Sequence, residues 1–445
     1  MDPPETETTP APAPSAPTSA RLAPLPYQEQ VRDYLKEREP RIWDWFRARH
    51  TGQEQTEQAE EVRLHLLKTT YRIERETHPA LYDLAEAAAA RLGVYSRITF
   101  YQSQNAGARG EAGRNAALAY LPGEAHLVLQ GPVTSTLSET ELKALVGHEL
   151  AHFKLYEDFD GEFRTTDDIL AAMTNDAEAR YTHQATYRLF RLYSEVFCDR
   201  GACLVTDDVA ATIRVLVKVE TGANEVSCER FLRQAEEIFL RTGKNGKPAA
   251  AGRVKTEGVT HPESFIRARA LGLWSQRGNA SNLEVAKMIE GSPALEELDL
   301  LAQTRVERLT RRLIDRFLSP RWMRSAPVLA HAHLFFEDYT PPEPDALGAE
   351  ENEQKEEEQS LAHELETSDN ALQDYYCYVL LDFATCDRSL EEAPLAAALL
   401  LCEKLGLGKR FGDIAGKELR LKKKALEKTR QSAEDILAKA QQVSG

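Results

Sequence analysis

The feature that most constrains this sequence is a pair of histidines four positions apart, His148 and His152, with Glu149 directly after the first. On an α-helix such residues lie on one face, so both imidazoles can bind the same metal ion. A glutamate at the second position points toward the open side of that ion, where it can accept a proton from water. The pattern therefore predicts a helix that holds one Zn²⁺ per chain, with Glu149 as general base.

The residues around this motif predict that it lies on an amphipathic helix. Ser138 followed by Glu141 is typical of a capping box at a helix start. Apolar residues then recur at helical spacing, as Leu142, Val146, Leu150 and Phe153. The two histidines lie to one side of this apolar stripe, so a helix with two surface histidines remains the alternative interpretation.

A catalytic zinc ion needs a third protein ligand, and Glu195 is the best candidate. It lies one helical turn before Asp199, in a helical pattern running from about residue 176 to residue 204, and both acids have apolar neighbours. Two acids on a largely apolar helix face are costly unless they are paired or bind a metal. We therefore expect Glu195 to bind the zinc and Asp199 to accept the second N–H of a ligating histidine. An exposed pair of acids is the alternative.

With these residues in place, the chain resembles the M48-type gluzincin metallopeptidases, which include the CAAX-processing protease and the heat-shock protease HtpX. The resemblance extends over roughly residues 60–275. It rests on four segments in the family's order: Asn115-Ala116, residues 141–152 with H-E-x-x-H, residues 195–199, and Thr260-His261-Pro262 to Arg267. Two positions depart from the family's pattern, because Leu145 stands where Val is usual and Cys198 where Ala is usual.

The resemblance implies a fold and further site residues. The expected fold is α+β, a mainly helical zincin-type metalloprotease domain with a small antiparallel sheet, followed by a small all-α domain. The zinc ligands and general base implied by the family are those already named. The resemblance also implies that His261 and Arg267 lie near the substrate or the oxyanion, and that Asn115 and Ala116 belong to a substrate-binding segment.

The composition of the whole chain limits the classes of partner and the cellular location that we expect. A formal net charge of −16 over 445 residues argues against nucleic-acid binding. The longest uncharged apolar run, Ala393 to Cys402, is too short to span a membrane, unlike the spans of many family members. Six cysteines without a C-x-x-C pair indicate free thiols in a reducing compartment. A cytoplasmic location is the expectation.

Changes in composition divide the chain into four expected parts. Residues 1–26, rich in Pro, Ala and Thr, read as a disordered leader and not as a signal peptide, and residues 27–339 as the peptidase domain with helical extensions. Residues 340–369, with clustered prolines and an acidic run, would be a solvated linker. Residues 370–445 resemble the TerB-like helical domain of tellurite resistance. They are the expected site of any protein partner. Their segment Lys417–Arg430 is expected to form a basic, solvated helix face.

Short strands are expected at residues 97–101, 115–120 and 125–129, the last two as a hairpin. An exposed sheet edge can bind an extended substrate as a further strand, and residues 115–120 are the expected edge, with a wholly structural sheet as the alternative. A loop at residues 156–166 is expected as a candidate lid, and a helix over residues 280–318 is expected to pack on the peptidase domain.

Together the residues and the resemblance predict a zinc-dependent metalloendopeptidase that acts on a protein or peptide substrate. Glu149 would take a proton from the attacking water and deliver it to the leaving amine, while His261 stabilises the oxyanion. The alternative is a zinc-containing scaffold or regulator that binds clients through residues 370–445 without cleaving them. Glu149 favours the enzyme, because a scaffold has no chemical need for a general base.

Overall fold

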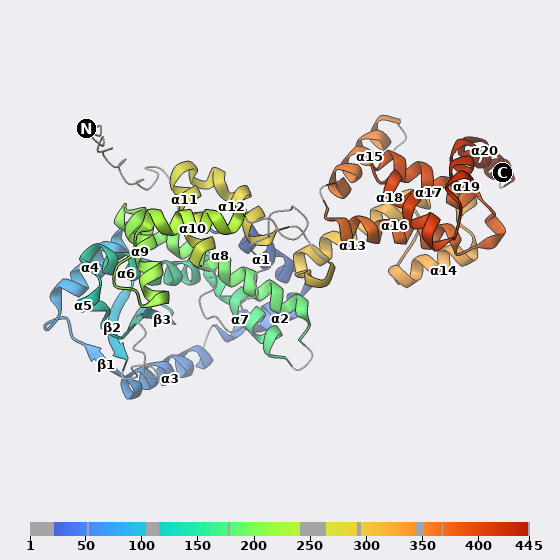
Figure 1. Ribbon diagram of the computed structural model, residues 1–445. Coiled ribbons are helices and arrows are strands. Elements are labelled where there is room, and N and C mark those ends of the chain that lie inside the picture. The colour runs from blue at the N-terminus through green and yellow to red at the C-terminus, as the bar shows by residue number, and fades with distance from the viewer. Residues whose placement is uncertain are drawn as a thin grey trace, which may run out of the picture. The chain divides into compact units, whose positions relative to one another are not determined.

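The fold is that of a computed structural model, which forms two compact units, residues 1–291 and 292–445 (Figure 1). The first unit combines many helices with one small sheet, and the second is all-helical, which confirms the predicted mainly helical α+β class. The residues that the structure describes are 22–50, 53–103, 115–176, 179–240, 264–291, 295–342, 351–366 and 368–443. Most of the predicted leader, residues 1–21, therefore lies outside them.

The sheet of the first unit has the strand order β1-β2-β4-β3. Its strands are β1 (Thr70–Ile73), β2 (Arg97–Ser103), β3 (Asn115–Leu121) and β4 (Glu124–Gln130). The predicted hairpin is confirmed, since β3 and β4 pair antiparallel around a turn in which Gly123 has a φ of +73°, a conformation that glycine adopts without strain. Strand β3 is an edge of the sheet within the described residues, as predicted.

Two features of the sheet differ from the prediction. Strands β2 and β4 pair in parallel, so the sheet is mixed and not antiparallel. The second strand of the hairpin lies next to β2 and the first lies outside it, and this placement makes β2 and β4 run in the same direction. The sequence pattern also does not predict β1, a four-residue strand that follows a helix directly and pairs antiparallel with β2.

Two long helices, α6 (Glu139–Glu157) and α8 (Tyr181–Thr206), form the centre of the first unit. The predicted capping box is present at the start of α6: the Glu141 N–H donates to Ser138 Oγ at 3.3 Å, and the Ser138 N–H donates to Glu141 Oε2 at 3.0 Å. The two helices approach closely, because a Cβ added at Gly201 would lie only 2.5 Å from the Cβ of Ala151. This contact brings the H-E-x-x-H helix beside the helix that carries Glu195.

The segment at residues 156–166 is not the predicted lid loop. Helix α6 continues to Glu157, a 3-10 turn covers Phe159–Gly161, and α7 (Glu162–Asn175) begins directly after it. The acidic, glycine-containing sequence does mark a chain reversal, with positive φ at Phe159 and Asp160, but a short turn suffices between two packed helices.

The remaining helices of the first unit surround this centre. Proline occupies the first position of three of them, which suits a residue without an N–H at a helix start. Helix α11 packs on α8 and α9 around the buried Trp274. These helices are α1 (Pro26–Arg38), α2 (Pro40–Arg49), α3 (Gln53–Thr69), α4 (Pro79–Leu92), α5 (Val133–Thr136), α9 (Val209–Thr221), α10 (Cys228–Leu240), α11 (Ser264–Arg277) and α12 (Asn282–Glu290).

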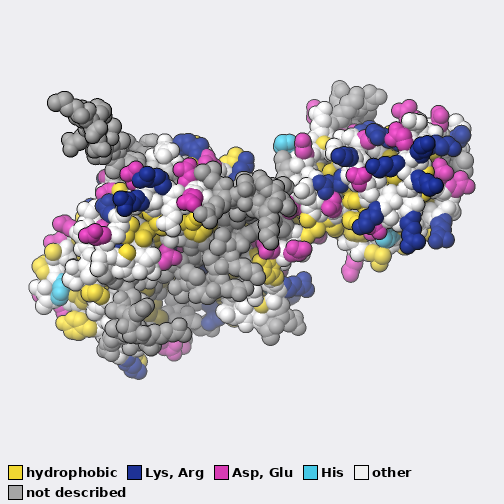
Figure 2. All heavy atoms as spheres, viewed as in Figure 1, with side chains coloured by type: hydrophobic (Ala, Val, Ile, Leu, Met, Phe, Trp, Pro, Cys, Tyr) yellow, Lys and Arg dark blue, Asp and Glu magenta, His cyan; other side chains and the backbone are white. Residues whose placement is uncertain are grey.

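The second unit is a bundle of helices around one apolar core. Its largest buried side chains include Tyr376, Phe383 and Phe411. Figure 2 shows many Lys and Arg side chains on this unit, and the described residues Lys422 to Lys424 are exposed, in keeping with the predicted basic face. The helices are α13 (Leu300–Phe317), α14 (Ala326–Phe335), α15 (Glu351–Glu366), α16 (Asn370–Thr385), α17 (Ala393–Lys404), α18 (Gly408–Glu418), α19 (Lys423–Gln431) and α20 (Ala433–Val443).

The domain boundaries differ from those predicted. The division between the units falls at residue 291, not at 339, and α13 packs on α15, α16 and α17 through residues such as Leu313 and Phe317. The expected linker contains a helix, α15, whose Leu361 and Leu365 are buried in the same core. Its acidic composition suggested a solvated segment, but two leucines one turn apart are enough to attach a helix. Among the described residues, no helix has the length and apolarity needed to cross a membrane.

Candidate metal centre

The two histidines of the motif lie side by side on α6 and face one carboxylate on α8. Their ring centroids are 5.0 Å apart. His148 Nε2 lies 3.3 Å from Glu195 Oε2, and His152 Nε2 lies 3.5 Å from Glu195 Oε1. The side chain of Glu195 is 4% exposed. Three residues from separate parts of the sequence therefore present donor atoms to one small space.

Two of the spacings between these donor atoms fit a zinc ion. Zinc binds nitrogen and oxygen at 2.0–2.2 Å in a tetrahedron, so neighbouring ligand atoms are about 3.3–3.6 Å apart. The two distances from His148 and His152 to Glu195 fall in this range. Two imidazoles and one carboxylate are also a donor set that catalytic zinc sites use, with the fourth position left for water or substrate.

Cys198 is a further potential ligand that the sequence interpretation did not include. Its Sγ and the ring nitrogens of His148 and His152 all lie within 4.8 Å of one another. The thiol is fully buried on α8, and burial together with the charges of Glu195 and Asp199 raises its pKa well above the usual value. We favour Glu195 as the ligand, because its two oxygens lie 3.3 and 3.5 Å from the imidazole nitrogens, the spacing of neighbouring zinc ligands. The spacing of three residues between Glu195 and Cys198 was the available signal, since it places them on neighbouring faces of one helix.

Behind the ligands, Asp199 and Arg267 form a buried layer of ion pairs. Asp199 Oδ1 lies 3.1 Å from His148 Nδ1, the position expected of a residue that orients this ring. Arg267, on α11, donates to both oxygens of Asp199 at 2.8 and 2.7 Å, and its Nη1 lies 2.9 Å from Glu195 Oε2. The guanidinium thus links the two acids of α8, and it contacts the acids and not an open substrate space.

Burial and charge pairing set the protonation of this cluster. Burial alone would lower the pKa of His148, but hydrogen bonds to Asp199 and Glu195 outweigh it and raise that pKa to about 10. Burial lowers the pKa of His152. For Glu195, burial acts to raise the pKa, but Arg267 and the two histidines hold it well below the usual value. Asp199 and Glu195 are therefore anionic, and Arg267 and a protonated His148 balance their charges, so a metal ion would bind in place of the proton on His148.

Glu149 lies beside the ligands and next to the edge strand. Its side chain is buried, with the residue 6% exposed, and burial raises the pKa of its carboxyl to about 7. The backbone of Leu118 in β3 acts to lower this pKa. Asn115 and Ala116 lie at the start of the same strand, where the Ala116 N–H donates to Asn115 Oδ1 at 2.9 Å. The edge strand thus runs past the general-base candidate.

The structure therefore brings together most of the residues predicted from the sequence. The cluster consists of His148, Glu149, His152, Glu195, Asp199 and Arg267, and β3 approaches it through Leu118. His261, with the T-H-P segment around it, lies outside the described residues.

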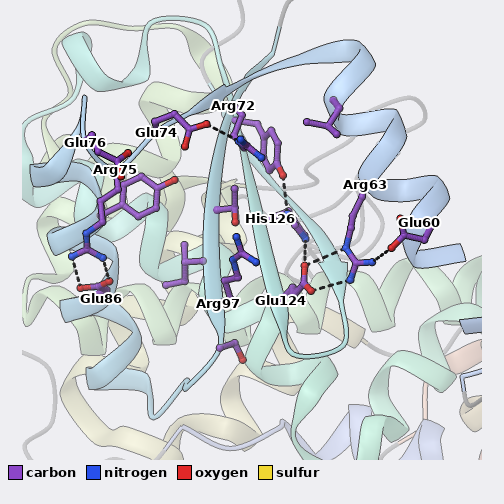
Figure 3. Close-up of a pocket in the computed structure, with 16 residues that line it drawn as sticks. Glu60, Arg63, Arg72, Glu74, Arg75, Glu76, Glu86, Arg97, Glu124 and His126 are labelled. Atoms are coloured by element: carbon purple, nitrogen blue, oxygen red, sulfur yellow. Dashed lines mark hydrogen bonds and ion pairs between the residues drawn. The ribbon is translucent and has the colours of Figure 1, made fainter. Parts of the chain in front are cut away.

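A second group of charged residues lines a cavity of 720 Å³ between α3, α4 and the sheet (Figure 3). Tyr101 and His126 are joined there by a 3.2 Å hydrogen bond, and His126 Nε2 lies 3.0 Å from Glu124 Oε2. Three of the four arginines on its wall are paired with glutamates, as Arg63 is with Glu124 at 2.9 Å. This cavity offers a single imidazole, so within the described residues it lacks the donor set of the α6–α8 centre.

Comparison with known proteins gives one relative. The plastoglobule-localized metallopeptidase 48 of the chloroplast, from Arabidopsis thaliana, is 29% identical over 160 residues. The match covers 34% of this chain and 45% of that protein, so the chain spans less than half the length of this relative. No family model matches the chain, and no solved structure is similar to it. The similarity agrees with the M48-type resemblance seen in the sequence motifs.

Proposed function

We propose that this protein is a zinc-dependent metalloendopeptidase that hydrolyses peptide bonds in protein or peptide substrates. The observation that carries the proposal is that the Nε2 atoms of His148 and His152 lie 3.3 and 3.5 Å from the two oxygens of Glu195, a spacing that suits neighbouring ligands of a zinc ion. A buried carboxylate, Glu149, lies beside these donors. The similarity to a protein named a metallopeptidase supports the same function.

Each residue of the cluster has a distinct part in the proposed reaction. Zinc, when bound, supplies Lewis-acid chemistry that polarises the scissile carbonyl and lowers the pKa of water. Glu149 accepts the proton of the attacking water and passes it to the leaving amine. Asp199 holds the ring of His148 through Nδ1, so that Nε2 faces Glu195 and would be the atom that holds the metal.

Arg267 takes a different part from the one implied by the family resemblance. All three of its nitrogens are occupied by Asp199 and Glu195, and the residue is 4% exposed. We therefore assign it as a positioning residue that neutralises and orients the two acids, and not as a group at the oxyanion. Stabilisation of the oxyanion remains a proposed role for His261.

The edge strand is the proposed guide for the substrate. An extended peptide can add as a further strand to the sheet edge that β3 forms among the described residues, held by main-chain hydrogen bonds. Asn115 and Ala116 begin this strand, and its Leu118 contacts Glu149. A peptide bound along β3 would therefore pass the general base, and main-chain binding would tolerate varied substrate sequences.

The decisive experiment compares the parent with Glu149→Gln and a control, Glu139→Gln, in the full chain. Glu139 lies at the exposed start of the same helix. Zinc content and cleavage of an unfolded protein such as casein are measured for each. We expect one zinc per chain in all three and cleavage by the parent and the control only. Cleavage by Glu149→Gln at the parent's rate would reject Glu149 as general base. Absence of zinc from the parent would reject the zinc site. Zinc in all three proteins without cleavage by any of them would favour the alternative of a non-cleaving scaffold.

A further inference from the structure

A largely buried carboxylate outside the proposed metal centre, Asp167 on α7, lies between the two helices that carry the proposed metal ligands. The hydroxyl of Tyr156 on α6 donates to Asp167 Oδ2 at 3.0 Å. Arg191 Nη1 on α8 lies 3.8 Å from the same oxygen. Helix α7 packs against both α6 and α8 (Figure 1), so this carboxylate joins three helices at one point. The proposed mechanism makes no use of it.

The spacing along the chain places this junction next to the metal centre. Tyr156 follows His152 by four residues on α6, and Arg191 precedes Glu195 by four residues on α8. Residues four apart on a helix are neighbours on its surface, about 5–6 Å apart at Cβ. Each partner of Asp167 is therefore one helical turn from a different metal ligand, and both ligands lie on the side that faces the junction.

Placing a carboxylate at this largely buried position costs desolvation free energy, so its presence there requires an explanation. The side chain of Asp167 is 15% exposed, and its Oδ1 is buried and makes no hydrogen bond within the described part of the chain. Burial raises the pKa of Asp167, while Arg191 and Tyr156 act in the opposite direction. An apolar residue at this position would bury the same surface without the desolvation penalty of a charged group. Helix packing alone therefore does not account for an acid here.

We propose that Asp167 is a positioning residue for the metal centre, which uses Tyr156 and Arg191 to fix the spacing between His152 on α6 and Glu195 on α8. The inference rests on the proposed zinc site. Asp199 orients His148 by direct contact, whereas Asp167 acts through the neighbours of the other two ligands. Metal sites need their ligands held to within about 0.5 Å, so a fixed helix spacing contributes to metal affinity.

The test measures zinc affinity by chelator competition for the full-length parent, Asp167→Asn, Tyr156→Phe and the control Asp168→Asn. Asp168 is the next residue of α7, is 40% exposed and pairs with His50 at 2.8 Å, so it matches the chemistry of the change without touching the junction. We expect Asp167→Asn to weaken zinc binding by about tenfold or more, as for other supporting residues of metal sites. Tyr156→Phe should weaken it less, and Asp168→Asn should not change it.

The melting temperature of the metal-free proteins separates positioning from a general structural role. A structural role would lower this temperature in Asp167→Asn and leave the zinc affinity of the folded protein at the parent value, and that result would overturn the inference. Tyr156→Phe, which removes one hydroxyl, provides the same comparison if Asp167→Asn does not fold. A parent that binds no zinc would instead reject the proposed function, and a parent that binds zinc without cleaving leaves the positioning test intact.

Discussion

The first unit contains two similar groups of side chains. In each, an imidazole contacts a carboxylate, and the carboxylate pairs with a guanidinium. In the proposed metal centre, His148 lies 3.1 Å from Asp199, which pairs with Arg267. In the cavity of Figure 3, His126 lies 3.0 Å from Glu124, which pairs with Arg63. The partners and distances are nearly equal, so pairing geometry does not distinguish the two groups.

The two groups differ in how deeply their charges are buried and in how many side chains face the imidazole. The side chains of Asp199 and Arg267 are 4% and 5% exposed, whereas those of Glu124 and Arg63 are 26% and 36% exposed. The metal centre also adds a second imidazole and a second carboxylate, from His152 and Glu195, within 3.5 Å of each other. Most of the arginines in the cavity form partly solvated pairs with glutamates, and such pairs are common on protein surfaces.

The pKa shifts of the two histidines follow from this difference. Burial lowers the pKa of His126, and the single partly solvated Glu124 does not reverse the effect. Burial acts in the same direction on His148, but two buried carboxylates outweigh it and raise the pKa to about 10. The two groups therefore differ in the carboxylates that face the imidazole, which are two buried ones at His148 and a single partly exposed one at His126.

The largest contrast is expected when each histidine is removed. His148→Ala deletes one of three ligands and should abolish stoichiometric zinc binding, since a site with two protein ligands holds zinc weakly. His126→Ala should keep one zinc per chain, because its cavity lacks a second imidazole. Zinc content after dialysis against a weak chelator measures both. Loss of zinc from His126→Ala would break the comparison by showing that the cavity contributes to metal binding.

Removal of the two arginines should separate buried from exposed ion pairs. Arg267→Ala leaves Asp199 and Glu195 buried without their guanidinium, which should lower the free energy of unfolding by roughly 3–5 kcal/mol. Arg63→Ala breaks a partly solvated pair and should cost about 1 kcal/mol or less. Urea unfolding of the metal-free proteins, followed by circular dichroism, measures the difference. Similar losses for both variants would mean that burial does not distinguish the two groups.

A smaller contrast concerns the carboxylates that contact the imidazoles. Asp199→Asn keeps the shape of the side chain but removes the charge that orients His148, so zinc affinity should fall by about 10–100-fold. Glu124→Gln makes the corresponding change beside His126 and should leave zinc affinity unchanged. Chelator competition gives both affinities on one scale. An unchanged affinity for Asp199→Asn would show that Arg267 and Glu195 alone hold the ligand ring.

The parts of the site that sequence predicts well are those set by helical spacing. His148, Glu149 and His152 are fixed relative to one another by one helix, as are Glu195 and Asp199, and the structure brings the two groups together. The capping box and the β3–β4 hairpin follow from equally local rules. Local spacing does not state which helices meet, and here the resemblance to a family supplied that step.

The parts that sequence predicts poorly depend on contacts between distant segments. The parallel pairing of β2 and β4 depends on which strand of the hairpin lies inside the sheet. The engagement of Arg267 with two acids depends on where α11 packs on α8. The placement of α13 and α15 in the second unit depends on a few leucines among many charges. In each case the local pattern allows two arrangements, and long-range packing selects one.

The smallest effect is expected at Cys198, where helical spacing alone does not decide whether Glu195 or the thiol is the third ligand. Its thiol lies within 4.8 Å of the ring nitrogens, and the oxygens of Glu195 lie 3.3 and 3.5 Å from them, the spacing of neighbouring zinc ligands. Cys198→Ala should therefore keep one zinc per chain, change zinc affinity by less than about threefold and preserve cleavage, because alanine fills the buried position without a polar atom. The matched variant Glu195→Ala should lose zinc. If Cys198→Ala lost zinc while Glu195→Ala kept it, the thiolate would be the third ligand, and Glu195 would join Asp199 as a partner of the histidines.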